Sequence, residues 1–207
     1  RIYVKNMKKI AISLRVANIG KYEEKRDSIS YDWLKFFNKL DIFPILIPNL
    51  IQDLDLFLDE VKIDGIILSG GDNIGEDEMR DSTEKRIITY GIKKNLPIIG
   101  ICRGMQVLNL NFNGKVRFNE AIDHAGEKHE IQLKEEKLII NSYHNNLIKN
   151  EDELGDNLKS IAIASNDKTI EGFKHEKLPI FGIMWHPERE KTTFHYRLIN
   201  SFLRNEF

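Results

Sequence analysis

The sequence predicts an α/β fold in which a central, mostly parallel sheet is flanked by helices. Short runs of β-branched residues alternate with amphipathic stretches of helical length, a pattern typical of strands connected through helices. Two of the runs lead directly into turns that contain glycine, Ser69-Gly70-Gly71 and Cys102-Arg103-Gly104. Loops at the carboxyl ends of parallel strands gather at one edge of a sheet, so these turns are expected to lie close together.

In the first half of the chain, expected strands and helices alternate. Strands are expected at residues 9–14, 43–47, 64–68 and 97–101. Ser30 provides the side-chain oxygen of an N-cap, and the apolar spacing after it predicts a helix to residue 40. Further helices are expected over residues 54–61, 82–94 and 105–112.

The second half is richer in strands. We expect them at residues 130–133, 138–141, 160–164, 170–173 and 180–184, followed by a closing helix over residues 192–203. Neither a repeat nor a linker divides the sequence, which predicts a single domain over residues 7–207. Residues 1–6 precede a natural start at Met7 and are interpreted as a cloning remnant or a disordered start.

Composition excludes several classes of function. The 31 basic and 32 acidic residues nearly balance, and the absence of a basic patch argues against nucleic-acid polymers and anionic membranes as partners. A single cysteine allows neither an internal disulfide nor a thiolate metal cluster, which favours a cytoplasmic location. No apolar run approaches the length of a membrane span or of a signal-peptide core.

Cys102 is the candidate nucleophile. It lies in Gly100-Ile101-Cys102-Arg103-Gly104, between an apolar strand and an amphipathic helix. A sharp strand-to-helix turn would expose the sulfur, and the positive helix N-terminus would lower the thiol pKa. The backbone amide of Arg103 would then be an oxyanion-hole donor. Alone, the motif could equally mark a buried structural cysteine.

His186 and Glu188 are the candidate base and its orienting carboxylate. They occur in Trp185-His186-Pro187-Glu188, directly after the last expected strand. In extended backbone, residues two apart point to the same side, so the carboxylate could hold the imidazole in one tautomer. Any one histidine is more often structural, and only the combination with the Cys102 turn predicts catalysis.

Gly71 is the expected second oxyanion donor, because a glycine amide can face the reacting carbonyl without a clashing side chain. No metal is expected: the spacing of His124 and His129 does not match a helical zinc pair, and no H-E-x-x-H motif occurs. His144 is expected to line a substrate cleft. Residues 72–84 are acidic and are interpreted as a solvated loop.

Together these segments resemble the class I glutamine amidotransferase family, and within it the peptidases of the γ-glutamyl-γ-aminobutyrate hydrolase type. The resemblance spans nearly the whole chain. It rests on the motifs GIILSGG (residues 65–71), RDSTE (80–84), GICRGMQVLN (100–109), NSYH (141–144), IASND (163–167), IEG (170–172) and WHPE (185–188).

The resemblance implies a flavodoxin-like fold with a nucleophile elbow and a thioester cycle that needs no cofactor. Cys102 would attack a γ-glutamyl amide, an amine would leave, and water would hydrolyse the thioester to release L-glutamate. It also implies contacts with the small γ-glutamyl substrate from residues beside the triad: Gly70, Gln106, Ser142, Tyr143 and His144.

The compact, Lys-, Ile- and Asn-rich sequence is most similar to hydrolases of γ-glutamyl-CDP-amidate, which release a cytidine diphosphoramidate in capsular polysaccharide phosphoramidate synthesis. This resemblance implies a bulky anionic leaving group. Candidate phosphate partners are Arg80, Lys85, Arg103 and Arg117, since guanidinium groups pair with phosphate oxygens.

Other functions remain open. The chain could be a γ-glutamyl-γ-aminobutyrate-type hydrolase, or a glutaminase subunit that delivers ammonia to a synthase. A non-catalytic binding module with this fold is disfavoured by the complete triad, and a cysteine peptidase by the absence of a readable peptide groove. A homodimer is compatible with the sequence.

Overall fold

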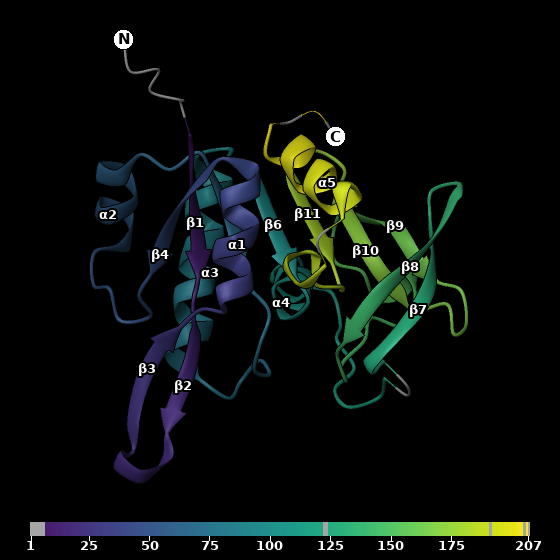
Figure 1. Ribbon diagram of the computed structural model, residues 1–207, viewed down its shortest axis with the longest axis horizontal. Coiled ribbons are helices and arrows are strands. Elements are labelled where there is room, and N and C mark those ends of the chain that lie inside the picture. The colour runs from purple at the N-terminus through teal and green to yellow at the C-terminus, as the bar shows by residue number, and fades with distance from the viewer. Residues whose placement is uncertain (1–6, 122–123, 191, 205, 207) are drawn as a thin grey trace.

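The computed structural model describes residues 7–121, 124–190, 192–204 and 206. Among them a nine-stranded sheet runs in the order β4-β1-β5-β6-β11-β10-β9-β7-β8 (Figure 1). The expectation for residues 1–6 lies outside the described residues.

The candidate site is carried by the parallel part of the sheet. This part consists of β4 (Ile42–Ile47), β1 (Lys8–Ser13), β5 (Gly65–Leu68), β6 (Ile98–Ile101) and β11 (Ile180–Ile183), each paired in parallel with its neighbour. Antiparallel strands extend the sheet beyond β11: β10 (Ile170–His175), β9 (Leu158–Ala164), β7 (Ala125–Leu133) and β8 (Glu136–Tyr143). The predicted α/β fold class is confirmed.

Helices cover both faces of the sheet, and the strands alternate between two cores. Ile10 and Ile12 of β1 pack in one cluster with α1 (Tyr31–Leu40) and α5 (Thr193–Leu203), whereas Ala11 packs in the other. That second cluster includes α2 (Leu54–Val61), α3 (Glu78–Lys93) and α4 (Arg103–Asn111). The two-residue period of a strand explains this division.

The caps of two helices show how the sequence sets their limits. The Ser30 side chain accepts the backbone N–H of Asp32, so α1 begins where expected. Helix α3 begins four residues earlier than expected, because the Asp77 side chain accepts from Met79 and Arg80. The interpretation of residues 72–84 as a solvated loop is therefore wrong in part: Arg80 and Glu84 are buried in α3.

A hairpin that was not expected from the sequence projects from the edge where β1 ends (Figure 1). It consists of β2 (Arg15–Ile19) and β3 (Glu24–Ser28), joined by the short turn η1 (Gly20–Tyr22). Lys25 of β3 lies 2.7 Å from Asp77, the cap of α3. The hairpin thus contacts the start of the helix that runs beneath the site.

Two further short turns are η2 (Glu151–Glu153) and η3 (Pro187–Arg189). Within the described part of the chain, no helix has both the length and the apolar character that crossing a membrane requires.

Candidate active site

Three loops meet at the carboxyl edge of adjacent strands. β5, β6 and β11 are neighbours in the sheet, and they lead into Gly70, Cys102 and His186 respectively. A Cβ built on Gly70 would lie 2.7 Å from His186 Cε1 and 3.4 Å from Cys102 Cβ. The structure therefore brings together these three segments, which are far apart in the sequence.

Cys102 occupies a strained turn. Its backbone has φ 52° and ψ −108°, outside the regions that side-chain-bearing residues prefer, and α4 starts at the next residue. The turn is crowded, because a Cβ added at Gly104 would overlap the carbonyl oxygen of Leu68. The flanking glycine permits this tight turn, and the geometry is that of a nucleophile elbow.

His186 and Glu188 are in contact, although not for the expected reason. His186 Nδ1 lies 2.7 Å from Glu188 Oε1, but β11 has ended at Ile183 and Glu188 lies in the turn η3. The two side chains therefore do not meet through the alternation of an extended strand. Instead, Asn141 of β8 fixes His186 by accepting from its N–H and donating to its carbonyl, each at 2.9 Å.

The titration of Cys102 and His186 is coupled. Burial alone would raise the pKa of the Cys102 thiol, but a hydrogen bond to His186, the charges of His186 and His144, and the Arg103 backbone N–H lower it below its ordinary value. Burial alone would lower the pKa of His186, but Cys102 and Glu188 raise it to about 9. These opposite shifts favour a thiolate–imidazolium pair.

The glycine loop, residues 69–71, forms the wall of the site opposite His186. Gly71 has φ +127°, a conformation that favours glycine, and an added Cβ there would lie 2.6 Å from Arg15 Nε. Arg80 lies below the loop and donates to the carbonyl oxygens of Ser69 and Gly70, both at 3.0 Å. The buried guanidinium group of Arg80 thus fixes the backbone of the glycine loop through hydrogen bonds.

Arg80 belongs to a buried charge network rather than to a phosphate site. Glu84 accepts from Arg80 Nε at 3.2 Å and from the side chain of Arg103, which also pairs with Asp81. Both arginine side chains are buried. The structure does not support the prediction that Arg80 and Arg103 bind phosphate, because their guanidinium groups are only 1% and 2% exposed and Glu84 binds both of them.

The two other predicted phosphate partners lie away from Cys102. Arg117 pairs with Glu153 at 2.7 Å and with Glu120 at 3.4 Å. Lys85 lines a separate cavity, between α3 and α4, that does not include Cys102. Neither residue contributes to the cleft beside the nucleophile.

A cavity of about 470 Å³ opens beside Cys102, and its lining includes three of the five predicted substrate residues: Gln106, Tyr143 and His144. Gly71 and His186 line it as well, whereas Gly70 lines a smaller pocket. Ser142 is not among the residues that line the cavity. Its hydroxyl is fully buried and donates to the backbone carbonyl of His124, so the expectation of a substrate contact from Ser142 is wrong. The Gln106 side chain accepts from Asn146 at 3.2 Å.

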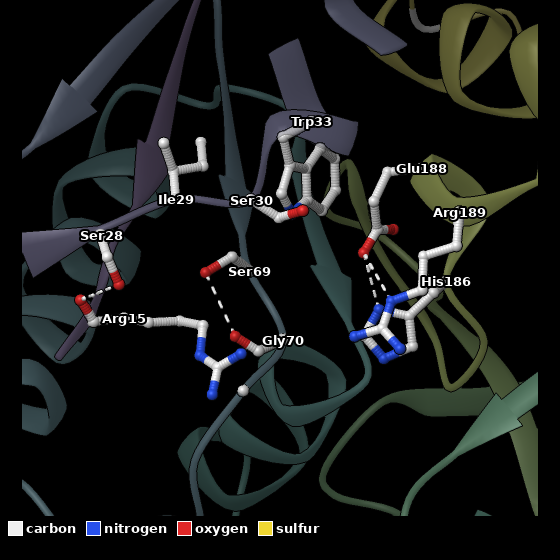
Figure 2. Close-up of a pocket in the computed structure, with 11 residues that line it drawn as sticks. Arg15, Ser28, Ile29, Ser30, Trp33, Ser69, Gly70, His186, Glu188 and Arg189 are labelled. Atoms are coloured by element: carbon white, nitrogen blue, oxygen red, sulfur yellow. Dashed lines mark hydrogen bonds and ion pairs between the residues drawn. The ribbon is translucent and has the colours of Figure 1, made fainter. Parts of the chain in front are cut away.

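Two arginines at the cavity were not predicted from the sequence. Arg15 of the hairpin pairs with Asp72 at 2.8 Å, and the guanidinium of Arg189 lies 4.2 Å from the Tyr143 ring centroid. Both side chains are partly exposed. Figure 2 shows Arg15 beside Gly70 and Arg189 beside His186, around a smaller pocket of about 30 Å³ that Trp33 also lines.

The sequence offered only a weak signal for either arginine. Arg189 directly follows the WHPE motif, but Arg15 belongs to a hairpin whose polar strands show no clear alternation. Only the fold brings Arg15 to the cavity.

The sequence and the fold match known proteins over most of their length. The family model described as Glutamine amidotransferase class-I matches residues 24–205. A γ-glutamyl-CDP-amidate hydrolase of Campylobacter jejuni is 39% identical over 188 residues, which cover 87% of this chain and 90% of the relative. Anthranilate synthase component 2 of Saccharolobus solfataricus is 27% identical, over 86% and 93% of the two chains.

A solved structure from Thermoplasma acidophilum, that of a candidate GMP synthase component, superposes with a TM-score of 0.74 at 25% identity. The match covers 97% of this chain and 94% of that one.

Proposed function

Because the chain belongs to the class I glutamine amidotransferase family, we propose that it is a cysteine hydrolase that cleaves a γ-glutamyl amide C–N bond and releases L-glutamate. The observation that carries this proposal is the arrangement at Cys102. A strained cysteine of lowered pKa lies beside a histidine of raised pKa, which a carboxylate contacts at 2.7 Å.

The proposed cycle begins with acyl transfer. The Cys102 thiolate attacks the γ-carbonyl carbon, and the backbone amides of Gly71 and Arg103 stabilise the resulting oxyanion. Imidazolium at His186 gives its proton to the leaving nitrogen as the C–N bond breaks, which forms a γ-glutamyl thioester.

Hydrolysis then regenerates the site. Neutral His186 takes a proton from water, whose oxygen attacks the thioester, and the thiolate leaves with glutamate as product. Glu188 orients the imidazole and stabilises its charged form throughout. Gly70, Gln106, Tyr143 and His144 are proposed to hold the glutamyl portion.

We propose γ-glutamyl-CDP-amidate as the substrate and cytidine diphosphoramidate as the second product, in capsular phosphoramidate synthesis. Similarity to the Campylobacter jejuni hydrolase supports this choice. So do Arg15 and Arg189 at the cavity, because guanidinium groups bind diphosphate oxygens in bidentate fashion. A γ-glutamyl-γ-aminobutyrate-type leaving group would not need two arginines there.

Comparative kinetics test the substrate. We expect kcat/KM for γ-glutamyl-CDP-amidate to exceed that for γ-glutamyl-γ-aminobutyrate and for glutamine by several powers of ten. Arg15→Met and Arg189→Met should reduce this advantage by at least about tenfold each while leaving glutamine turnover little changed. Lys177→Met, on a different cavity, is the matched control. If kcat/KM is highest for γ-glutamyl-γ-aminobutyrate, the proposal of a nucleotide leaving group is wrong, whereas the proposed thioester mechanism stands.

A glutaminase component of a synthase is the second candidate, because the chain is similar over most of its length to anthranilate synthase component 2. It predicts glutamine as the best substrate, with slow turnover alone and stimulation by a partner. The same kinetic comparison therefore separates the two functions.

A further inference from the structure

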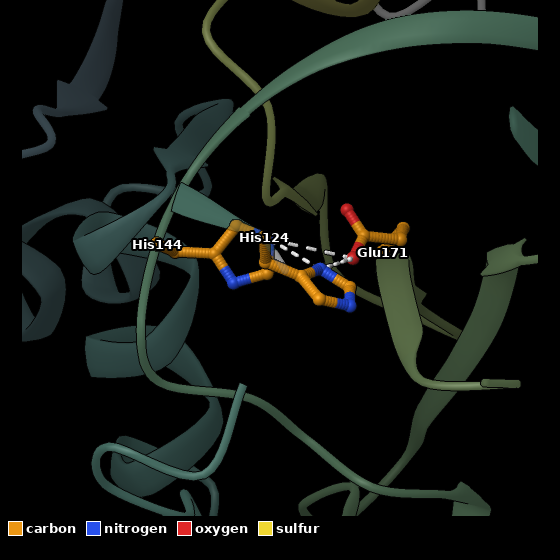
Figure 3. Close-up of side chains that lie close together, drawn as sticks. All are labelled: His124, His144 and Glu171. Atoms are coloured by element: carbon orange, nitrogen blue, oxygen red, sulfur yellow. Dashed lines mark hydrogen bonds and ion pairs between the residues drawn. The ribbon is translucent and has the colours of Figure 1, made fainter. Parts of the chain in front are cut away.

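A cluster of buried histidines lies behind the cavity wall. His124 precedes β7, His144 follows β8, and Glu171 lies in β10. Figure 3 shows their side chains converging from these three elements. His124 and Glu171 are fully buried and His144 is 4% exposed. None of them has a role in the proposed thioester cycle beyond the contact of His144 with the cavity.

Hydrogen bonds on the outer side of each ring fix which nitrogen faces the cluster. His144 Nδ1 lies 2.8 Å from the carbonyl oxygen of Asn146, which can only accept, so Nδ1 carries the hydrogen. His124 Nε2 lies 2.8 Å from the Asp167 carboxylate and donates to it. When both rings are neutral, the two inward nitrogens, His124 Nδ1 and His144 Nε2, are therefore the ones that carry lone pairs.

The three inward atoms have the separations of metal ligands. His124 Nδ1 lies 3.3 Å from His144 Nε2, and Glu171 Oε1 lies 3.7 Å and 3.5 Å from these nitrogens. Around a tetrahedral zinc ion with bonds of about 2.0–2.2 Å, neighbouring ligand atoms are about 3.3–3.6 Å apart. The triangle is thus close to the size that one bound zinc ion requires.

The cluster also contains polar atoms without partners. Both carboxylate oxygens of Glu171 and both ring nitrogens of His129 are buried and lack a hydrogen bond among the described residues. His129 Nε2 lies 3.6 Å from Glu171 Oε2. A buried polar atom without a hydrogen bond destabilises the fold. A bound cation would give the buried carboxylate of Glu171 a partner.

We propose that His124, His144 and Glu171 bind one Zn²⁺ ion, with one coordination position left open. Two imidazoles and one carboxylate form a known zinc ligand set, and the Asp167–His124 contact is the outer carboxylate that often accompanies a metal-bound histidine. The ion would fix His144 in the wall of the cavity, close to Cys102. The sequence pattern predicted no metal, because these ligands come from three separate elements.

Metal titration tests the site directly. Tag-free, full-length protein stripped with a chelator should bind one equivalent of zinc in competition with a chromophoric chelator. Its Co²⁺ form should show the visible absorption bands of a four-coordinate site. His124→Ala and Glu171→Gln should weaken zinc binding by at least about 100-fold, and Asp167→Asn by about 10–100-fold.

Two variants make the result specific. Cys102→Ser should bind zinc as tightly as the wild type, since the ligands do not include the thiol. His175→Gln, which changes a histidine on the far cavity, should do the same. Loss of binding in Cys102→Ser would place the ion at the nucleophile and overturn the proposal.

Failure of the wild type to bind zinc at micromolar concentrations would also overturn the proposal, and a proton shared by His144 and Glu171 would then explain the cluster. If His124→Ala does not fold, as judged by circular dichroism, the Co²⁺ spectrum of the wild type decides. Absence of four-coordinate bands would count against the site.

Discussion

At the scale of single residues, the proposed chemistry depends on one sulfur, one imidazole and one carboxylate. Cys102→Ala should abolish glutamate release while the fold persists, because the chain has no second thiol. His186→Ala should lose nearly as much, since nucleophile and base act as a unit. Glu188→Gln should cost less, because Glu188 only orients and stabilises.

Rapid quenching followed by mass spectrometry should reveal a γ-glutamyl adduct on the Cys102 peptide during wild-type turnover. Near-normal activity in purified Cys102→Ala would contradict the mechanism. So would the lasting absence of an adduct under single-turnover conditions in which chemistry is fast.

The pH dependence of kcat/KM should follow the thiolate–imidazolium pair. On the acid side, activity should fall as the Cys102 thiolate is protonated. The midpoint of this acid limb should lie below the ordinary thiol pKa of about 8.5. It should fall again on the alkaline side near pH 9, as His186 loses the proton that the leaving nitrogen needs.

Because Glu188 is one cause of the raised pKa of His186, Glu188→Gln should move the alkaline limb to lower pH. Initial rates measured from about pH 4 to about pH 11 define both limbs, and the fold is checked over the same pH range. An alkaline limb that stays in place in Glu188→Gln would refute the assignment.

A substitution at Gly70 tests the position of the His186 imidazole without altering a reacting group. In Gly70→Ala the new methyl group would lie 2.7 Å from His186 Cε1, so the imidazole must move. A displacement of about 1 Å can cost about 10²-fold in rate, and we expect that loss in kcat/KM with an unchanged melting temperature. Gly20→Ala, where an added Cβ meets nothing within 4 Å, is the control and should keep full activity.

At the scale of elements, Glu84 joins α3 to the start of α4 and to β1. It accepts from Arg80, from Arg103 and from the Ser13 hydroxyl at 2.8 Å, and it is fully buried. Glu84→Ala would leave two buried guanidinium groups without this partner, so we expect a loss of about 3–5 kcal/mol in the free energy of unfolding.

Urea unfolding measures that loss, and Glu60→Ala, an exposed glutamate in α2, should change stability by less than about 0.5 kcal/mol. Equal effects of the two substitutions would mean that the buried network does not hold the elbow in place.

The elements also show what the sequence could and could not predict. Regular apolar spacing located α1, α2 and the buried strands to within a few residues, and the glycine turns located the elbow. The β2–β3 hairpin was missed because its polar strands carry no such spacing. The buried charges of α3 were missed because an acidic segment looks the same in sequence whether water or an arginine faces it.

The same reasoning explains the outcome for the site. Cys102, His186 and Glu188 stand in local motifs, so their positions could be read from the sequence. Contacts between distant segments bring Arg15 to the cavity and bring His124, His144 and Glu171 together. No local sequence pattern predicts such contacts.

At the scale of the whole molecule, the continuous sheet predicts one cooperative unit for residues 7–207. The parallel and antiparallel parts are joined where β11 pairs with β10, and one core cluster includes residues from both parts, such as Ile10 and Ile131. Thermal unfolding followed by tryptophan fluorescence and by far-ultraviolet circular dichroism should therefore give coincident single transitions. Two separated transitions would indicate that the β7–β8–β9 part unfolds on its own.

Cys102 is the only cysteine in the chain, and its pKa is lowered. Although Cys102 is only 5% exposed, it lines the open cavity, and a thiolate that peroxide can reach is oxidised to a sulfenic acid. Many redox-tolerant enzymes recover through a neighbouring resolving cysteine, which would trap the oxidised sulfur as a disulfide. This chain has no such partner, so repair depends on a thiol supplied by the surroundings. Without one, the sulfur is open to further, irreversible oxidation, and each molecule that reaches that stage is permanently inactive.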